Sequence, residues 1–312
     1  MNALIAAAFA LLASAPSQQT LPLSPVVSGH YTVEVTLGEN GPYPFILDTG
    51  ASHTAVAEPL AETLGFVSTR TALDNVQSLT TRFEAERFML RDLRVGTIQA
   101  EQMNAVVIPV APETELASVG LLGADAFADR RIRIDFTTLT LDLDAPQTAY
   151  RDGVIDETSQ LLIGYGRARG MRSEFHVMID TGAARTMVNT ALAVRESRPL
   201  ARIHLGMYSL GGVDGSEKEQ TDFVDLRRVR IGGRCVRRLP ALKNDLDVFR
   251  ALGWEDQPAM ILGMDFLAGA VLTIDRTRGT FQLESGPSPG CQPRDRVQRE
   301  TSGLSPSDWR RD

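Results

Sequence analysis

Short apolar-rich runs separated by turn residues dominate the pattern of the chain. Residues 30–37 (HYTVEVTL) alternate between apolar and polar positions, and residues 160–166 (QLLIGYG) form a similar apolar-rich run later in the chain. Each is followed by a segment with Gly, Pro or charged residues, which predicts a hairpin. Helical character is limited to short segments around 57–64 and 190–195. The pattern therefore predicts an all-β fold with a few short helices.

The same order of segments occurs twice. Each copy has an opening hairpin, an apolar strand that ends in Asp-Thr-Gly-Ala, a strand pair, a glycine-centred apolar motif and two closing strands. The corresponding segments are 45–52 and 177–184, 87–109 and 222–242, 120–127 and 260–267, and 131–143 and 271–285. This duplication predicts two homologous lobes at 28–145 and 159–285, joined by a polar linker at 146–158.

The N-terminus has the features of a secretory signal. Residues 4–13 (LIAAAFALLA) are too short to span a bilayer but suit the apolar core of a signal peptide, and Ala-Ser-Ala at 13–15 resembles a cleavage site. No Lys or Arg precedes the run and Pro16 would follow the cut, so an uncleaved or wrongly assigned N-terminus is the alternative. We predict a signal peptide at 1–15, a short segment at 16–27, and a secreted or periplasmic location.

Composition narrows the range of partners. The 312 residues carry a net charge of −7, and the sequence shows no Lys/Arg cluster of the kind that binds phosphates, so no nucleic-acid partner is expected. No second apolar run approaches membrane length, and no His or Cys spacing suits a metal, so we expect no membrane insertion after signal removal and no cofactor. Cys235 and Cys291 could pair in an oxidising compartment, or they could be unrelated thiols. Residues 286–312 predict a disordered tail.

The repeated Asp-Thr-Gly triplets at 48–50 and 180–182 are the candidate chemistry. Hydrolysis of a peptide without a metal or a covalent intermediate needs a base to activate water and an acid to protonate the leaving nitrogen. Two adjacent carboxylates cannot both ionise, so they share one proton and supply both functions. Gly50 and Gly182 would let the backbone approach each carboxylate and donate N–H bonds without a clashing Cβ.

These motifs resemble those of the aspartic peptidase superfamily, most closely its retropepsin-like branch, over nearly all of residues 28–285. Ala51 and Ala183 stand where pepsin-like enzymes usually have Ser or Thr. The resemblance implies two β-barrel lobes related by a pseudo-two-fold axis, with Asp48 and Asp180 as the catalytic pair. It also implies interlocking roles for Thr49 and Thr181, and supporting positions beneath the site for Leu122, Gly123, Leu262 and Gly263.

The resemblance also directs attention to flaps, the hairpins that close over substrate in this superfamily. Residues 207–219 (MYSLGGVDGSEKE) are similar to a flap, with Tyr208, Gly211 and Gly212 as candidates, although an ordinary surface hairpin is the alternative. The corresponding stretch of the first copy, 71–81, has no glycine and is expected to be degenerate. This asymmetry predicts one mobile flap, or a cleft that is more open on one side.

The sequence thus predicts a monomeric aspartic endopeptidase that binds an extended polypeptide and uses no cofactor. The alternative is a non-catalytic peptide-binding or scaffold protein that retains the fold. Ala51 and Ala183 lack a hydroxyl that would donate to a carboxylate, which predicts a mildly acidic pH optimum. Asp125 and Asp265 follow the glycine-centred motifs, where a structural role at a helix N-terminus is favoured over a role in the site.

Overall fold

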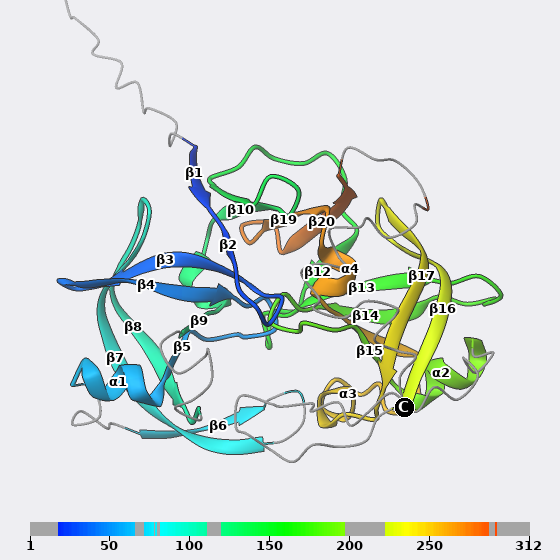
Figure 1. Cartoon of the computed structure of the whole chain (residues 1–312), viewed down its shortest axis with the longest axis horizontal. Helices are drawn as coiled ribbons and strands as arrows, with labels where there is room; N and C mark the ends of the chain where they lie inside the picture. Colours follow the sequence, from blue (N-terminus) through cyan, green and yellow to red (C-terminus); the bar gives the residue numbers. More distant parts are fainter. Residues whose placement is uncertain are drawn as a thin grey trace, which may run out of the picture.

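The computed structural model describes residues 18–65, 72–77, 79, 82–110, 120–196, 222–286 and 291. Within them nearly all of the regular secondary structure is β-strand, arranged as two lobes side by side (Figure 1). The only helices in this part of the chain are short, and none is long and apolar enough to cross a membrane.

Six strands of the first lobe close into a barrel. In spatial order they are β3 (Tyr31–Leu37), β4 (Asn40–Leu47), β9 (Gly120–Leu122), β5 (Ala55–Ala57), β8 (Ile98–Ile108) and β7 (Arg82–Val95), and β7 pairs back onto β3. Strand β2 (Ser24–Pro25) adds to β3, and β6 (Ala72–Gln77) adds to β7. The helix α1 (Glu58–Thr63) and the 3-10 turn η3 (Ala124–Phe127) complete the lobe.

The second lobe repeats this barrel strand for strand. Its order is β13 (Leu162–Arg167), β14 (Phe175–Ile179), β18 (Ala259–Leu262), β15 (Met187–Val188), β17 (Arg234–Lys243) and β16 (Asp222–Ile231), and β16 pairs back onto β13. The helices are α2 (Thr190–Glu196), α3 (Asp247–Ala251) and α4 (Met264–Leu267). The prediction of two homologous β-barrel lobes is confirmed.

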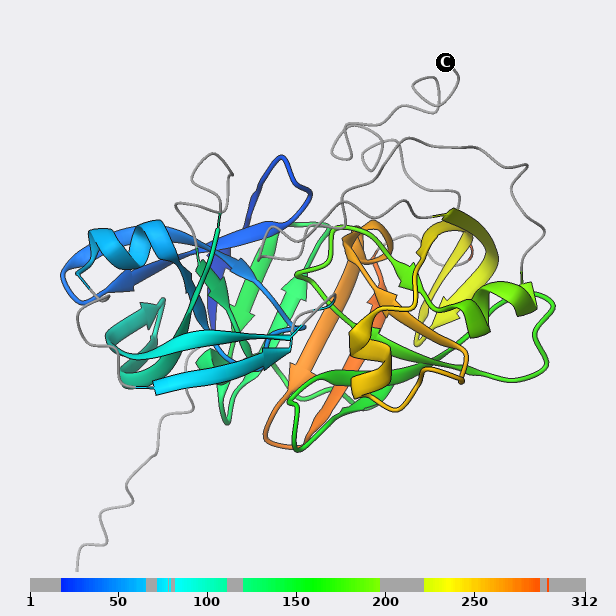
Figure 2. The same cartoon turned by 90° about the horizontal axis from the view of Figure 1, so that it is seen from below.

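The closing strands of the two lobes join them. β1 (Gln19–Pro22), β11 (Thr140–Leu143), β10 (Arg131–Asp135), β19 (Ala270–Asp275), β20 (Thr280–Ser285) and β12 (Gly153–Ile155) form a continuous sheet in this order. Figure 2 shows the green and orange closing strands between the lobes. β10 and β19 pair with Arg131 opposite Asp275 and Asp135 opposite Val271, so the pseudo-two-fold axis passes between them. β12 lies within the segment 146–158 that was expected to be a linker.

Buried aliphatic and aromatic side chains from both barrels and from the interlobe sheet form one large apolar cluster, which includes Phe45, Ile134, Phe175 and Leu272. Because this core is continuous, the lobes do not pack as independent units. The predicted signal and most of the tail lie outside the described residues.

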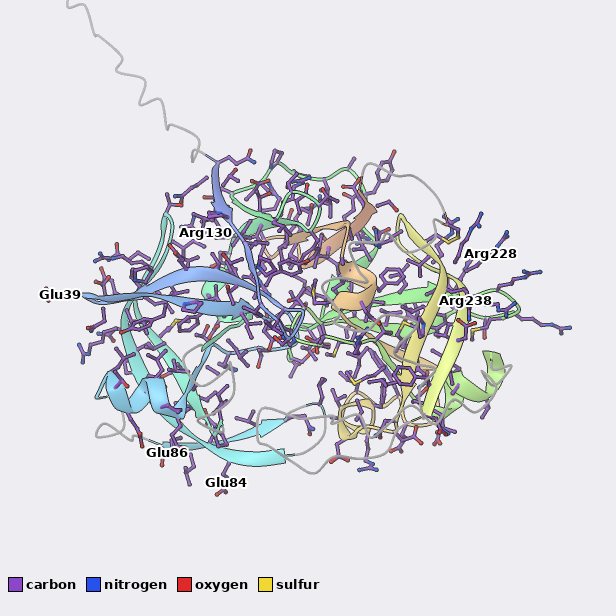
Figure 3. The ribbon with its side chains drawn as sticks, viewed as in Figure 1. Glu39, Glu84, Glu86, Arg130, Arg228 and Arg238 are labelled. Carbon is purple, nitrogen blue, oxygen red and sulfur yellow. A yellow bond between two sulfur atoms is a disulfide. The ribbon has the colours of Figure 1, made fainter. Side chains whose placement is uncertain are left out.

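The hairpin of β16 and β17 carries one half of the disulfide and a group of exposed arginines. Cys235 on β17 forms a disulfide with Cys291, which resolves the two alternatives for these cysteines in favour of pairing. The hairpin also carries exposed arginines at 227, 228, 230, 237 and 238, and Arg228 and Arg238 project outward in Figure 3. Two of these arginines, Arg227 and Arg238, form ion pairs with Asp225 on β16.

Candidate active site

Asp48 and Asp180 occupy equivalent strand ends. Asp48 follows β4 and Asp180 follows β14, and both strands run parallel to the strand of a glycine-centred motif. The backbone N–H of Asp48 donates to the carbonyl of Leu122 at 3.1 Å, and that of Asp180 donates to the carbonyl of Leu262 at 3.0 Å. Leu122 and Leu262 therefore support the two active-site loops from the neighbouring strand, as the resemblance implied.

The two loops bring their carboxylates together across the lobe interface. A Cβ built on Gly50 would lie 2.6 Å from Cγ of Asp180, and one built on Gly182 would lie 2.4 Å from Cγ of Asp48. The backbone N–H of each glycine donates to Oδ1 of its own loop's aspartate at 2.8 Å. Only glycine fits these two positions, because a methyl group would occupy the space of the opposing carboxylate.

The environment separates the two carboxyl groups electrostatically. Burial raises the pKa of Asp48, while the N–H of Gly50 and the nearby His30 oppose that rise. The pKa of Asp180 is raised well above its usual range, first by burial and then by the negative charge of Asp48. Asp180 is also the more enclosed group, with 3% of its surface exposed. Burial and the charge of Asp48 thus both oppose ionisation of Asp180.

Thr49 and Thr181 interlock the lobes directly beneath the carboxylates. The hydroxyl of Thr49 donates to the carbonyl of Ile179 at 2.9 Å and accepts the N–H of Thr181 at 3.0 Å. The hydroxyl of Thr181 donates to the carbonyl of Leu47 at 2.6 Å and accepts the N–H of Thr49 at 3.0 Å. Four buried hydrogen bonds thus cross the interface and fix the separation of the two aspartates.

A second pair of threonines, which the sequence analysis missed, anchors the glycine-centred motifs. Thr54 accepts the N–H of Gly123 at 3.2 Å, and its own N–H donates to Asp125 at 2.9 Å. Thr186 makes the equivalent bonds, to Gly263 at 3.2 Å and to Asp265 at 2.9 Å.

Each of these threonines lies at the same distance along the chain from its aspartate, so alignment of the two copies could have found both. Asp125 and Asp265 lie in the first turns of η3 and α4 and accept these bonds, which agrees with the favoured structural role.

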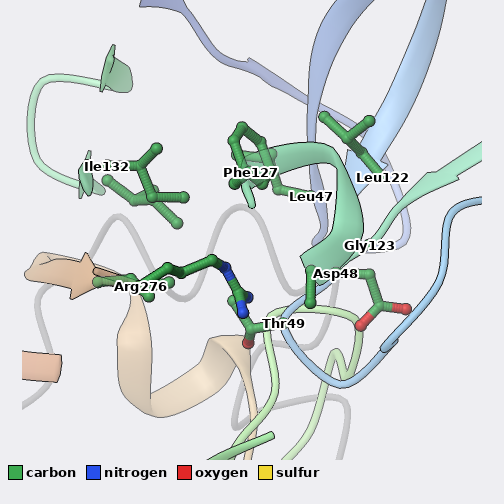
Figure 4. Close-up of a pocket in the computed structure, with 11 residues that line it drawn as sticks. Leu47, Asp48, Thr49, Leu122, Gly123, Phe127, Ile132 and Arg276 are labelled. Atoms are coloured by element: carbon green, nitrogen blue, oxygen red, sulfur yellow. The ribbon is translucent and has the colours of Figure 1, made fainter. Parts of the chain in front are cut away.

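A small pocket on the core side of the first active-site loop contains an unexpected charge. Asp48 and Thr49 line it together with apolar side chains, and the guanidinium of Arg276 enters it from the second lobe (Figure 4). Within the described part of the chain, Nε of Arg276 is buried without a hydrogen-bond partner. Burial lowers the pKa of this guanidinium, and the charge of Asp125 partly offsets that effect. The equivalent residue of the first copy is Phe136.

The predicted flap and the corresponding stretch of the first copy have different outcomes. Residues 207–219, with Tyr208, Gly211 and Gly212, lie outside the described residues. The first-copy stretch was expected to be degenerate, but β6 and the start of β7 pair regularly from Ala72 opposite Arg87 to Gln77 opposite Arg82.

The tip of this hairpin reaches the second lobe, where the carbonyl of Leu79 accepts the N–H of Val248 at 3.5 Å. Backbone pairing and an ion pair between Asp74 and Arg87 hold the hairpin without glycine, so this stretch is regular where a degenerate one was expected.

The described residues contain no group of three or more His, Cys, Asp or Glu side chains that could hold a metal ion. The site itself consists of the two carboxylates and the backbone that surrounds them. Such a site can take up and release a proton at two adjacent oxygens, which is the requirement for concerted general acid–base work.

Two barrels with a pair of aspartates at their interface define a two-lobed protein of the acid protease type. A family model described as aspartyl protease matches residues 33–126 and 166–266, which include both Asp-Thr-Gly triplets and together make up more than half of the chain. The chain belongs to this aspartyl protease family. No curated protein matches the chain.

Proposed function

We propose that the protein is an aspartic endopeptidase that hydrolyses peptide bonds with water activated between Asp48 and Asp180. The observation that carries this proposal is the mutual placement of the two carboxylates, each against the glycine of the opposite loop. Membership of the aspartyl protease family supports the same class of reaction. The substrate is a polypeptide, and no cofactor takes part.

In the proposed reaction, the two carboxyl groups share one proton and act as base and acid. The ionised carboxylate accepts a proton from water while the water oxygen attacks the scissile carbonyl carbon. The protonated carboxyl group donates its proton to the carbonyl oxygen of the substrate. Collapse of the tetrahedral intermediate transfers a proton to the leaving nitrogen and breaks the C–N bond. The four hydrogen bonds of Thr49 and Thr181 keep the carboxylates at a fixed separation through both steps.

An extended peptide is the form of substrate that suits this architecture. β6 is the outermost strand of the first-lobe sheet in the described part of the chain, and its hairpin extends to Val248 of the second lobe. An outer strand can pair its backbone with an added peptide strand, which gives affinity with little dependence on sequence.

The proposed setting is an oxidising compartment, because the disulfide between Cys235 and Cys291 requires one. The predicted signal at 1–15 agrees with a secreted or periplasmic location. Ala51 and Ala183 give the carboxylates no hydroxyl donor, and burial raises the pKa of both aspartates, so the optimum is expected to be mildly acidic.

Digestion of unfolded casein between about pH 4 and 7, with and without pepstatin, tests the proposal. Asp48→Asn and Asp180→Asn should each abolish cleavage, because each removes half of one acid–base unit. Asp256→Asn, at an exposed carboxylate, is the matched control and should retain full activity.

Cleavage that persists in both dyad variants would exclude this site as its source. A folded wild-type protein that binds unfolded casein but cuts no peptide in a broad library would instead identify a non-catalytic peptide-binding protein.

A further inference from the structure

His30 breaks the symmetry of the candidate site. The registers of β3 with β4 and of β13 with β14 place His30 and Leu161 at equivalent points relative to Asp48 and Asp180. Leu161 is a buried apolar residue within the second lobe. His30 is half-buried, and its side chain crosses from the first lobe to the loop of the second. The position next to the dyad is thus titratable in only one of the two copies.

The contacts of His30 lead directly to the two carboxylates. Its Nε2 lies 2.9 Å from the carbonyl oxygen of Gly182, and its Nδ1 lies 2.9 Å from Oγ of Ser28. The N–H of Gly182 donates to Asp180 at 2.8 Å, and the carboxylate of Asp48 lies against the Cα of Gly182. A single residue, Gly182, therefore separates the imidazole from both members of the dyad. Because a carbonyl only accepts, Nε2 must carry hydrogen.

We propose that His30 is a positioning residue which holds the Gly182 carbonyl and, when protonated, keeps the negative charge of the dyad on Asp48 and the shared proton on Asp180. This inference rests on the proposed peptidase function and assigns the base and the acid within it. Asp48 is then the group that takes a proton from water, and Asp180 is the group that protonates the substrate carbonyl oxygen.

The other charged groups around the dyad do not provide the same control. Arg276 lines the pocket beside Asp48 and Thr49, but its charge persists at every pH of interest. Tyr31 follows His30 in the chain, but its ring packs against Phe136 at 5.6 Å between centroids, and burial raises its pKa. The two dyad loops also carry Arg185, whose charge persists at every pH of interest, and His53, whose Nδ1 lies 2.9 Å from Oγ of Ser52.

The expected effect on activity is a shift of the acidic limb of the pH–rate profile. In general, a unit charge about 7 Å from another in an effective dielectric constant of about 40 shifts the titration of that group by about one pH unit. Protonated His30 stabilises the singly ionised dyad, so it lowers the pH at which the active form appears. Removal of its charge should therefore move the acidic limb to higher pH by about one unit.

His30→Gln and His30→Leu separate the two parts of the proposal. Gln can still donate to the Gly182 carbonyl but carries no charge, so kcat at the optimum should be nearly retained while the acidic limb of kcat/KM shifts upward. Leu reproduces the second copy and loses the hydrogen bond too, so kcat should also fall. An acidic limb that stays in place in folded His30→Gln would overturn the proposal.

A titration that needs no catalysis distinguishes failure of this proposal from failure of the proposed function. The ring resonances of His30, assigned by their loss in His30→Gln, are followed by NMR in the wild type and in Asp48→Asn. Because the two charges stabilise each other reciprocally, the His30 transition should move to lower pH in Asp48→Asn and stay in place in Asp256→Asn. A transition that Asp48→Asn leaves unmoved would refute the coupling, whether or not the protein cuts peptides.

Discussion

The hydroxyl of Thr181 can be removed with almost no change in side-chain shape, which makes the lobe interface open to a direct test. In Thr181→Val, the carbonyl of Leu47 and the N–H of Thr49 both lose the hydroxyl that bonds them across the lobe interface, at 2.6 and 3.0 Å. Both groups belong to buried residues, so water cannot replace the hydroxyl without opening the interface.

The magnitude follows from these two groups. A buried donor or acceptor left without a partner costs about 1–3 kcal/mol, so the two groups together should lower the free energy of unfolding of Thr181→Val by roughly 2–6 kcal/mol. That is a large part of the total stability of about 5–15 kcal/mol that is typical of folded proteins. Peptidase activity should fall as well, because the same bonds set the separation of the carboxylates.

Urea unfolding at pH 7 measures the change in stability, with Thr63→Val as the control. Thr63 is exposed and its hydroxyl bonds only within α1, to the carbonyl of Pro59, so its loss should cost less than about 0.5 kcal/mol. A cost below about 1 kcal/mol for Thr181→Val would refute the interlocking role.

The companion variant Thr49→Val completes a double-mutant cycle. The four hydrogen bonds of Thr49 and Thr181 are distinct, so the two losses should add if the lobes stay docked. If the second substitution lowers the free energy of unfolding much less than the first, one substitution already separates the lobes.

Three further predictions concern groups around the site. The pKa of Asp180 is raised in the folded state, so the stability that it contributes is present at low pH and is lost as pH rises through the folded pKa. Asp180→Asn should therefore show a smaller fall in Tm between about pH 4 and 7 than the wild type, and an identical fall would contradict the burial argument. Arg276→Met removes a buried Nε without a partner, so the free energy of unfolding should change by less than about 1 kcal/mol or rise, whereas a loss above about 2 kcal/mol would reveal a stabilising role. Cys235→Ser opens a loop with a sequence separation of 56 residues and should cost about 2–4 kcal/mol in chemical denaturation, and an unchanged midpoint would show that the disulfide adds no stability.

Much of the fold could be predicted from the sequence because the copies repeat the same local signals. The strand that ends at Asp48 and the strand that ends at Asp180 are both apolar runs closed by the same triplet, and each is buried in its barrel as such a run requires. The dyad and its glycines could be predicted for the same reason, since their geometry depends on close approach that only those residue types allow.

The first hairpin shows what a local pattern leaves out. The lack of glycine in 71–81 predicts a degenerate hairpin, whereas β6 and β7 pair regularly and the carbonyl of Leu79 accepts the N–H of Val248, which lies far away in the chain. No local pattern records such a contact, because cross-strand register and loop position are set by tertiary structure. The arginines of β16 and β17, by contrast, are already close together in the sequence, at 227–238.

The differences between the copies matter as much as their identity. Residues that match across the pseudo-two-fold axis, such as Thr49 and Thr181, hold two carboxylates in an arrangement that by itself favours neither as the base. A single proton must nevertheless lie on one of them, and burial and charge decide which. His30 differs from its counterpart Leu161, and this difference biases the proton toward Asp180. A duplicated site thus acquires separate acid and base roles through a substitution outside the repeated motif, at a position that motif comparison alone would pass over.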